Sequence, residues 1–186
     1  LLLCLATFLT YPGLVSAAYK DLDYVNRPIT DDVFYFVMLD RFFDGDPSNN
    51  TGGFAVEDDK RFDSAAILKH GYWPKDKGYY MGGDFKGLTE KLDYLKGMGV
   101  TALWLSPVQK NNPVQGGGKL DNSSAGYHGY WVTDFTTVDP HFGDEAAFKK
   151  LVDAAHSKGM KVFIDVIANH TADIIHFKEC SDCSYR

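Results

Sequence analysis

Three runs of apolar, aromatic and β-branched residues predict the strands of this chain. They cover residues 33–43, 101–108 and 161–167. Continuous apolar character over such short lengths is typical of strands buried on both faces, as in parallel sheets. The pattern therefore predicts three buried strands that belong to one sheet.

Helical periodicity occupies the stretches before the second and third runs. Apolar residues at this spacing before the second run are Leu88, Leu92, Leu95 and Met98, and those before the third are Phe148, Leu151, Val152 and Ala155. Gly97 and Gly99 are suited to end the first helix. Asp144 is a suitable N-cap for the second, and Gly159 a suitable stop. The order β-α-β-α-β predicts an α/β fold with parallel strands and right-handed crossovers.

The connections at the two ends of the predicted strands differ greatly in length. Segments 44–87 and 109–143 follow the carboxyl ends of the first two strands, whereas loops in α/β units usually have about 2–6 residues. The helix-to-strand links at Gly99 and Gly159 are minimal. Because α/β barrels build their sites from the loops after the strands, we expect one functional face and one structural face.

Composition and charge narrow the class of protein. The 186 residues are 45% hydrophobic and 24% charged, a globular composition, and the length suits one domain. The formal net charge is −6, which argues against a nucleic-acid binder with a basic stripe. An enzyme that acts on an uncharged ligand fits this balance.

The first residues resemble an incomplete secretion signal. Residues 1–9 are almost continuously apolar, Pro12 and Gly13 interrupt them, and Ala17 follows other small residues that a signal peptidase reads. The apolar run is shorter than the about 20 residues of a membrane-spanning helix. We expect a signal peptide over residues 1–17 and a secreted, extracellular protein that leaves the membrane once the signal is removed. The alternative is a buried N-terminal helix.

Two cysteines near the end form a single Cys-x-x-Cys pair, Cys180 and Cys183. One such pair supplies half of a zinc site, and the chain holds no second pair. Outside the cell a disulfide is the favoured interpretation, either between these two or to another residue.

Two clusters carry oxygen-rich or glycine-rich chemistry. Residues 44–50 (DGDPSNN) place four Asp and Asn side chains on a turn, which suits a hard cation such as calcium or, alternatively, an Asx-rich surface turn. Gly82 and Gly83 allow a close backbone approach to a ligand, and Asp84 is suited to cap the next helix.

Two further clusters follow predicted strands. Residues 126–131 (GYHGYW) have the aromatic and polar composition of a sugar-binding loop, although aromatic residues also pin long loops to a core. Asp165 lies in the third apolar run, where a carboxylate needs a partner, and Asn169 and His170 emerge at the end of that run. Their position favours a functional role over a structural histidine.

Five motifs in order resemble the α-amylase family, glycoside hydrolase family 13. They are DRFFDGDPSNN (40–50), GGDFKGL (82–88), GVTALWLSPV (99–108), GYHGYWVTDF (126–135) and DVIANH (165–170). The resemblance, closest to cyclodextrin glucanotransferases and related secreted amylases, implies the N-terminal part, about three strands, of a (β/α)8 TIM barrel over residues 18–170. Residues 171–186 would begin the domain inserted after the third strand.

The resemblance also implies roles for individual residues. Six residues resemble the family's ligands of a first calcium ion: Asp44, Asp46, Asn49, Asn50, Gly82 and Asp84. Asn169 resembles a ligand of a second calcium ion. Four residues resemble the family's substrate-binding residues: His128, Tyr130, Trp131 and His170. Asp165 resembles the carboxylate that holds the substrate-binding residues in place at the end of the third strand.

The implied parent is a secreted, calcium-dependent retaining glycosidase that acts on α-1,4-glucans. Such enzymes need two carboxylates about 5–5.5 Å apart, and the family's pair would lie beyond Arg186, so we expect this chain alone to be inactive. The alternatives are a cyclodextrin glucanotransferase-type transglycosylase, a non-catalytic carbohydrate-binding relative, and an unrelated α/β protein with a calcium loop.

Overall fold

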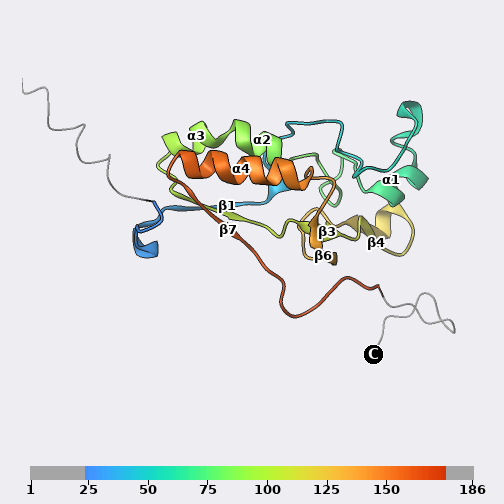
Figure 1. Cartoon of the computed structure of the whole chain (residues 1–186). Helices are drawn as coiled ribbons and strands as arrows, with labels where there is room; N and C mark the ends of the chain where they lie inside the picture. The colour runs from blue at the N-terminus through green and yellow to red at the C-terminus, as the bar shows by residue number, and fades with distance from the viewer. Residues whose placement is uncertain (1–23, 175–186) are drawn as a thin grey trace, which may run out of the picture.

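A computed structural model describes residues 24–174 of the chain, and the predicted signal peptide and cysteine pair lie outside them. The described part is an α/β structure with a parallel sheet and helices on one side of it (Figure 1). The strands are β1 Phe34–Val37, β2 Ala102–Leu105, β3 Gln109–Asn111, β4 Val114–Gly116, β5 Ser123–Ala125, β6 Val132–Val138 and β7 Lys161–Ile164. The α-helices are α1 Ser64–His70, α2 Phe85–Glu90, α3 Leu92–Gly97 and α4 Glu145–Ser157, and the 3-10 helices are η1 Ile29–Asp31, η2 Leu39–Arg41, η3 Asp58–Lys60 and η4 Leu120–Asn122.

The three predicted strands form one parallel sheet in the order β1-β2-β7, which confirms the expected topology. Its alternate residues divide between two faces. Val37, Leu103 and Leu105 are buried, on the face over which Figure 1 shows α2, α3 and α4. Phe36 and Trp104 lie on the other face, 45% and 44% exposed. The core therefore lies between the sheet and one layer of helices.

The predicted helices form, with one correction. Asp144 caps α4 by accepting a hydrogen bond from the Ala147 amide at 2.7 Å, and Gly159, at φ +71°, follows its end. The earlier helix, predicted as one, is two short helices separated by Lys91. Lys91 has φ −100° and ψ 4°, outside the helical region, and the apolar spacing alone could not reveal this break.

All three strands are shorter than the apolar runs predicted. β1 ends at Val37, after which the chain turns into η2. β7 ends at Ile164, so Asp165 and the residues up to His170 are not in a strand. The prediction that Asp165 lies within the third strand is therefore wrong, because it directly follows the last strand residue. The residues beyond β2, Ser106 and Val108, are buried, whereas Val166 beyond β7 is 64% exposed, so apolar character alone does not mark where the strands end.

The long connections after β1 and β2 carry elements that the apolar pattern did not indicate. The first contains η3 and α1, and the second contains two antiparallel pairs, β3 with β6 and β4 with β5. These pairs are short, and that of β3 with β6 has register shifts. They give the second connection its own backbone hydrogen bonds and hold the 126–131 loop between β5 and β6.

A charged network ties the strands together at their amino ends. The Asp32 carboxylate accepts hydrogen bonds from Arg27 Nε at 2.6 Å, Thr101 Oγ1 at 2.9 Å and Lys161 Nζ at 2.6 Å. Arg27 comes from the segment before β1, Thr101 directly precedes β2, and Lys161 is the first residue of β7. This end of the sheet is therefore closed by structural contacts, in agreement with its minimal loops.

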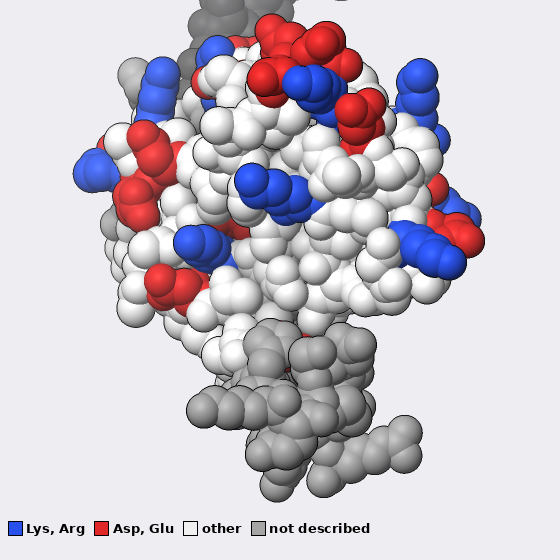
Figure 2. Space-filling view, turned by 90° about the vertical axis from the view of Figure 1, so that its right-hand side faces the viewer, with Lys and Arg blue, Asp and Glu red and all other residues white. Residues whose placement is uncertain are grey.

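The face shown in Figure 2 carries positive and negative side chains interleaved around largely uncharged surface. Among the described residues on that face, no continuous basic patch is visible. No helix formed by residues 24–174 has the length and apolar character needed to cross a bilayer.

Candidate functional site

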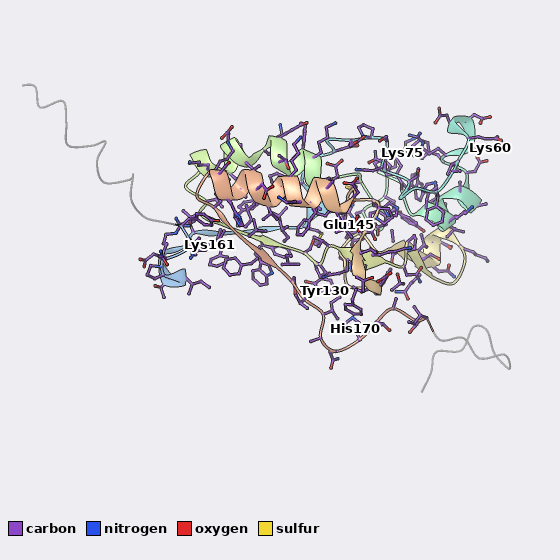
Figure 3. All side chains as sticks on the ribbon, viewed as in Figure 1. Lys60, Lys75, Tyr130, Glu145, Lys161 and His170 are labelled. Carbon is purple, nitrogen blue, oxygen red and sulfur yellow. The ribbon has the colours of Figure 1, made fainter. Side chains whose placement is uncertain are left out.

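Four of the residues predicted to bind sugar, together with Asp165, meet at the carboxyl end of the parallel sheet. Tyr130 Oη donates a hydrogen bond to Asp165 Oδ2 at 2.7 Å. His170 Nε2 lies 3.0 Å from the Tyr130 carbonyl oxygen, and Figure 3 shows Tyr130 and His170 together below the sheet. His128 is stacked with Tyr130 at 5.7 Å between ring centroids and meets Trp131 edge to face at 4.7 Å. We call these five residues the aromatic cluster.

The hydrogen bonds within the aromatic cluster fix which ring nitrogens carry protons. His128 Nδ1 accepts from the Tyr130 amide at 3.0 Å, so a neutral His128 ring carries its proton on Nε2. His170 Nε2 faces a carbonyl oxygen and must donate, which leaves Nδ1 of a neutral ring as an acceptor. The two rings thus provide one donor and one acceptor beside the Tyr130 ring, which is 36% exposed.

Two titrating groups in the aromatic cluster are shifted. Burial, with a smaller contribution from the Arg41 charge, lowers the pKa of His128 below its ordinary value. The hydrogen bond to Asp165, reinforced by burial, raises the pKa of Tyr130. Both shifts favour uncharged rings near neutral pH, which suits contact with an uncharged, hydroxyl-rich ligand.

The 44–50 loop is folded around Asp84, the predicted helix cap. Asp84 Oδ1 caps α2 through the Gly87 amide at 2.6 Å, and Oδ2 accepts from the Asp46 amide at 2.7 Å and from Asn49 Nδ2 at 3.2 Å. Asp84 is fully buried. One carboxylate therefore fastens the loop to the start of α2, which confirms its predicted capping role.

Three side-chain oxygens of this loop are buried without a hydrogen-bond partner among the described residues: Asp44 Oδ1, Asn49 Oδ1 and Asn50 Oδ1. Gly82, at φ +98°, is next to two of these side chains. A Cβ at Gly82 would lie 2.6 Å from Asn50 Oδ1 and 2.9 Å from Asp44 Oδ2. Unpaired buried oxygens are unfavourable unless a cation or water satisfies them. We call Asp44, Asn49, Asn50 and Gly82 the oxygen cluster.

The remaining predicted ligands are placed differently. Asp46 turns its Oδ1 toward the Ser48 amide and hydroxyl, at 3.2 and 2.6 Å. Asn169 is exposed beside His170 and makes no hydrogen bond to the oxygen cluster within the described part. Residues 24–174 contain no group of three or more His, Cys, Asp or Glu residues that could hold a metal ion.

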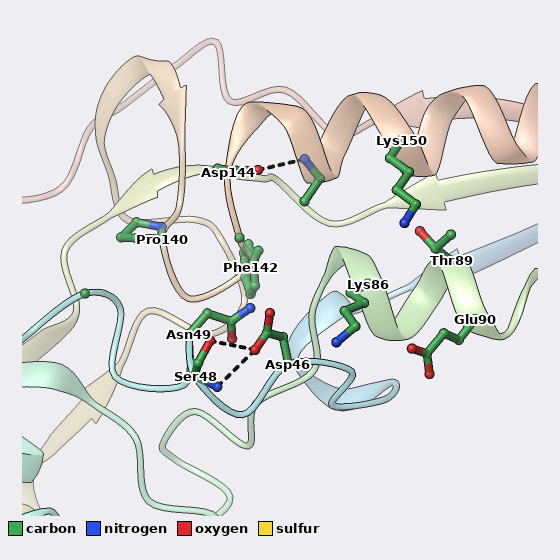
Figure 4. A pocket seen from close by; sticks show the side chains of 13 residues that line it. Asp46, Ser48, Asn49, Lys86, Thr89, Glu90, Pro140, Phe142, Asp144 and Lys150 are labelled. Atoms are coloured by element: carbon green, nitrogen blue, oxygen red, sulfur yellow. Dashed lines mark hydrogen bonds between the residues drawn. The ribbon is translucent and has the colours of Figure 1, made fainter.

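A pocket of about 490 Å³ adjoins the 44–50 loop on the helical side of the sheet. Figure 4 shows Asp46 and Asn49 at its wall, with Phe142 behind them and Lys86 and Lys150 at its rim. The pocket lies between α2 and the start of α4. It belongs to the oxygen-cluster side of the molecule and does not include any residue of the aromatic cluster.

Two residues at the aromatic cluster were not singled out from the sequence. Arg41 lies in η2, with its guanidinium carbon 3.8 Å from the centroid of the Tyr127 ring. Tyr127 in turn meets His128 edge to face at 5.1 Å. The available signal was a basic residue, directly after Asp40, inside the first apolar run.

Comparisons with known proteins agree with this arrangement. The model of the α-amylase catalytic domain matches residues 36–184. An α-amylase of Streptomyces lividans is 63% identical over 114 residues, which are 61% of this chain and 12% of that protein. A cyclomaltodextrin glucanotransferase of Geobacillus stearothermophilus is 42% identical over 158 residues, 83% of this chain and 20% of that protein.

A solved structure shares the fold as well as the sequence. The α-amylase of Geobacillus thermoleovorans, in complex with acarbose, matches with a TM-score of 0.54 and 41% identity over 80% of this chain and 25% of that one. The chain therefore spans 12% to 25% of the length of these three relatives. Since the matched family domain covers most of its residues, the chain belongs to the α-amylase family.

Proposed function

We propose that the whole protein containing this chain hydrolyses α-1,4-glucans such as starch and maltooligosaccharides, with retention of configuration. The observation that carries the proposal is the convergence of His128, Tyr130, Trp131 and His170 at the strand ends of an α-amylase-family domain. The acarbose complex of the G. thermoleovorans α-amylase supports a carbohydrate ligand for this fold. The parent's fold would be a (β/α)8 barrel, of which residues 18–170 form part.

The residues of this chain would bind and orient the sugar rather than break its bond. The Tyr130 ring offers a flat surface for the C–H face of a glucose ring, held in place by Asp165. His128 Nε2–H and His170 Nδ1 supply a donor and an acceptor for hydroxyl groups. A retaining mechanism also needs a carboxylate nucleophile and a carboxylic acid, and these are separate from the four rings assigned here to sugar binding.

We infer that the oxygen cluster holds calcium. Calcium takes six to eight oxygen ligands from carboxylates, amides and carbonyls, and the cluster supplies one carboxylate and two amide oxygens without partners. Gly82, whose lack of a side chain leaves room beside them, would contribute its carbonyl. The bound ion would neutralise Asp44 and tie the 44–50 loop to the segment before α2.

Maltoheptaose binding tests the proposed site. In the full-length protein, Tyr130→Ala removes the stacking surface, and we expect binding about tenfold weaker or worse by isothermal titration calorimetry, since aromatic contacts each contribute about 1 kcal/mol or more. Tyr94→Ala, on α3 and 61% exposed, is the matched control and should bind normally. Equal affinities of the two variants would exclude the aromatic cluster as the sugar site.

Calcium titration tests the ion site. We expect added calcium to raise the Tm of the protein and a chelator to lower it, because a ligand that binds only the folded state stabilises that state. Asp44→Ala should abolish the response, whereas Asp58→Ala, an exposed carboxylate of η3, should retain it. A Tm that changes with neither calcium nor chelator would contradict the assignment of a calcium site to the oxygen cluster.

A transglycosylase is the second candidate, favoured by the 42% identity to a cyclomaltodextrin glucanotransferase over 83% of this chain. Product analysis distinguishes the reactions: linear oligosaccharides from starch indicate hydrolysis, and cyclic products indicate intramolecular transfer. Binding without any turnover would indicate the third candidate, a non-catalytic carbohydrate-binding relative.

We also propose that the protein is secreted, on the basis of the apolar run in residues 1–17. Expression of the full-length gene in its host, followed by separation of medium and cells, tests this. A protein found in the medium without these residues would agree with the proposal, and an intracellular protein that retains them would contradict it.

A further inference from the structure

Arg41 connects η2 to the aromatic cluster through contacts that the roles above do not use. Its guanidinium carbon lies over the Tyr127 ring, 3.8 Å from the ring centroid. The same group donates from Nη1 to the Tyr79 carbonyl oxygen at 2.9 Å and from Nη2 to the Lys77 carbonyl oxygen at 2.6 Å. One side chain thus joins three segments that are far apart in sequence.

The guanidinium is held firmly in this position. Its side chain is 21% exposed, and Nη1 lies 3.2 Å from Oδ2 of the buried Asp40. Asp40 itself accepts hydrogen bonds from the Met81 and Gly82 amides at 2.9 and 3.1 Å. A planar fork with several donors can bond two carbonyl oxygens while its face stacks on an aromatic ring, which an ammonium group cannot do.

The Tyr127 ring connects Arg41 to the rings of the proposed sugar site. Tyr127 is packed against the hydrophobic core on one side and meets the His128 ring at 5.1 Å. His128 then contacts both Tyr130 and Trp131. A displacement of Tyr127 would therefore move the ring at the centre of the aromatic cluster.

We propose that Arg41 is a positioning residue for glucan binding: by clamping the Tyr127 ring, it fixes the place and orientation of His128. This inference rests on the proposed function, because it assigns Arg41 a part in the same sugar site. The two neighbours in η2 would then serve different sites, with Asp40 facing the segment beside the oxygen cluster and Arg41 facing the aromatic cluster.

Electrostatics act in the same direction as the packing. After burial, the Arg41 charge is the second cause of the lowered pKa of His128. A neutral His128 can accept the Tyr130 amide hydrogen at Nδ1, whereas a protonated ring cannot. The other titratable groups around His128 are Tyr127 and Tyr130, with Asp165 and His170 bonded to Tyr130. Arg41 thus protects both the geometry and the tautomer of His128.

The test compares variants of the full-length protein. In Arg41→Met, which removes the fork and the charge, we expect maltoheptaose to bind about tenfold more weakly, equivalent to about 1.4 kcal/mol. Arg41→Lys keeps the charge and loses the fork, so we expect an intermediate loss. Lys91→Met, which removes another cation–π contact at 3.9 Å from the Phe43 ring, is the matched control and should bind normally.

Titration of the His128 ring by NMR supplies a readout that a general loosening of the fold would not produce. We expect the His128 pKa to rise toward its ordinary value in Arg41→Met and to stay low in Arg41→Lys. If Arg41→Met does not fold, Tyr127→Leu tests the clamp by removing its other half, with the same expected loss of affinity as Arg41→Met.

The outcomes separate this inference from the function on which it rests. If the wild type binds maltoheptaose, and Arg41→Met binds within twofold with an unchanged His128 titration, the positioning role is overturned alone. If the wild type does not bind, the proposed function fails. In that case an unchanged His128 titration in Arg41→Met would also overturn the Arg41 contact, and a raised pKa would support it as a positioning contact of His128.

Discussion

At the scale of single residues, the histidines of this chain show that surroundings decide their roles. His70 and His141 are buried, 0% and 3% exposed, and both nitrogens of each ring are used inside the protein. Among the described residues, His128 and His170 each use one ring nitrogen, in a hydrogen bond to the Tyr130 backbone. His70 ends α1, whereas the other three lie outside the helices and strands, so the hydrogen-bond partners rather than the local sequence distinguish the two pairs of rings.

The bond between Tyr130 and Asp165 makes a prediction about the sugar site. Tyr130→Phe keeps the ring and removes the hydroxyl that reaches Asp165 at 2.7 Å. A hydrogen bond to a charged group contributes about 1.5–3 kcal/mol when buried, and less at this exposed position. We expect maltoheptaose affinity to fall about threefold to tenfold in calorimetric titrations. Tyr94→Phe on α3 should leave it unchanged, and an unaltered affinity in Tyr130→Phe would refute the anchoring role.

His70 makes a prediction about stability and pH. Burial lowers its pKa below the ordinary 6.5, so as the pH falls through 6.5 the unfolded chain takes up a proton that the folded chain resists. The stability that His70 contributes is therefore complete above that pH and decreases as the pH falls. In His70→Gln, whose amide supplies a donor and an acceptor without titrating, urea unfolding should show a smaller loss between pH 7.5 and 5.5. An equal loss in both proteins would contradict this origin of the pH dependence.

At the scale of elements, the sequence predicted the helices and strands that have a local, repeated pattern of apolar residues. The parallel order of three strands, the caps Asp84 and Asp144 and the stop at Gly159 all follow from short-range patterns. The antiparallel pairs β3–β6 and β4–β5 were missed because each strand of the shorter pair has three residues, too few for an alternating pattern. Their formation depends on pairing partners that are distant in sequence.

The candidate sites divide in a similar way. The residues of the aromatic cluster were found from their motifs, and the structure confirms that they lie together. The buried oxygens of Asp44 and Asn50 that lack a hydrogen-bond partner among the described residues could not be predicted, because they depend on side-chain orientation. Arg41 was missed for the same reason, since its contacts span positions 77 to 127.

The cap of α4 makes the prediction that belongs to this scale. Asp144 Oδ1 accepts from the Ala147 amide, and removal of such a cap typically reduces protein stability by about 1 kcal/mol. We expect Asp144→Ala to lower the free energy of unfolding by about that amount in urea titrations. Asp153→Ala, in an exposed pair with Lys149 on the same helix, should change it by less than about 0.5 kcal/mol. Equal changes in the free energy of unfolding for the two variants would show that the Asp144 cap does not stabilise the protein.

At the scale of the whole molecule, the two ends and the two faces of the sheet have different tasks. The amino end is closed by the Asp32 network, and the carboxyl end supports the aromatic cluster. One face is covered by α2, α3 and α4, whereas the other presents a set of aromatic rings. In a complete barrel of the proposed kind, this second face would be covered by further strands.

The open face makes a prediction about the 186-residue chain produced by itself. Phe34 packs on Phe163 at 5.0 Å and Phe36 on Trp104 at 5.4 Å, so the exposed rings form one continuous apolar surface. Contiguous exposed apolar surface of this kind promotes association. We expect concentration-dependent oligomers in sedimentation velocity and strong binding of the dye ANS.

The same experiment identifies the surface responsible. Trp104→Lys places a charge in the middle of the open aromatic face and should reduce both association and dye binding. Tyr94→Lys, which changes a more exposed aromatic residue on α3 (61% against 44% for Trp104), should leave both unchanged, because α3 lies on the covered side of the sheet. A chain that stays monomeric without binding the dye would show that the open face is shielded. Because α2, α3 and α4 cover the opposite face of the sheet, residues outside 24–174 would then have to cover the open aromatic face.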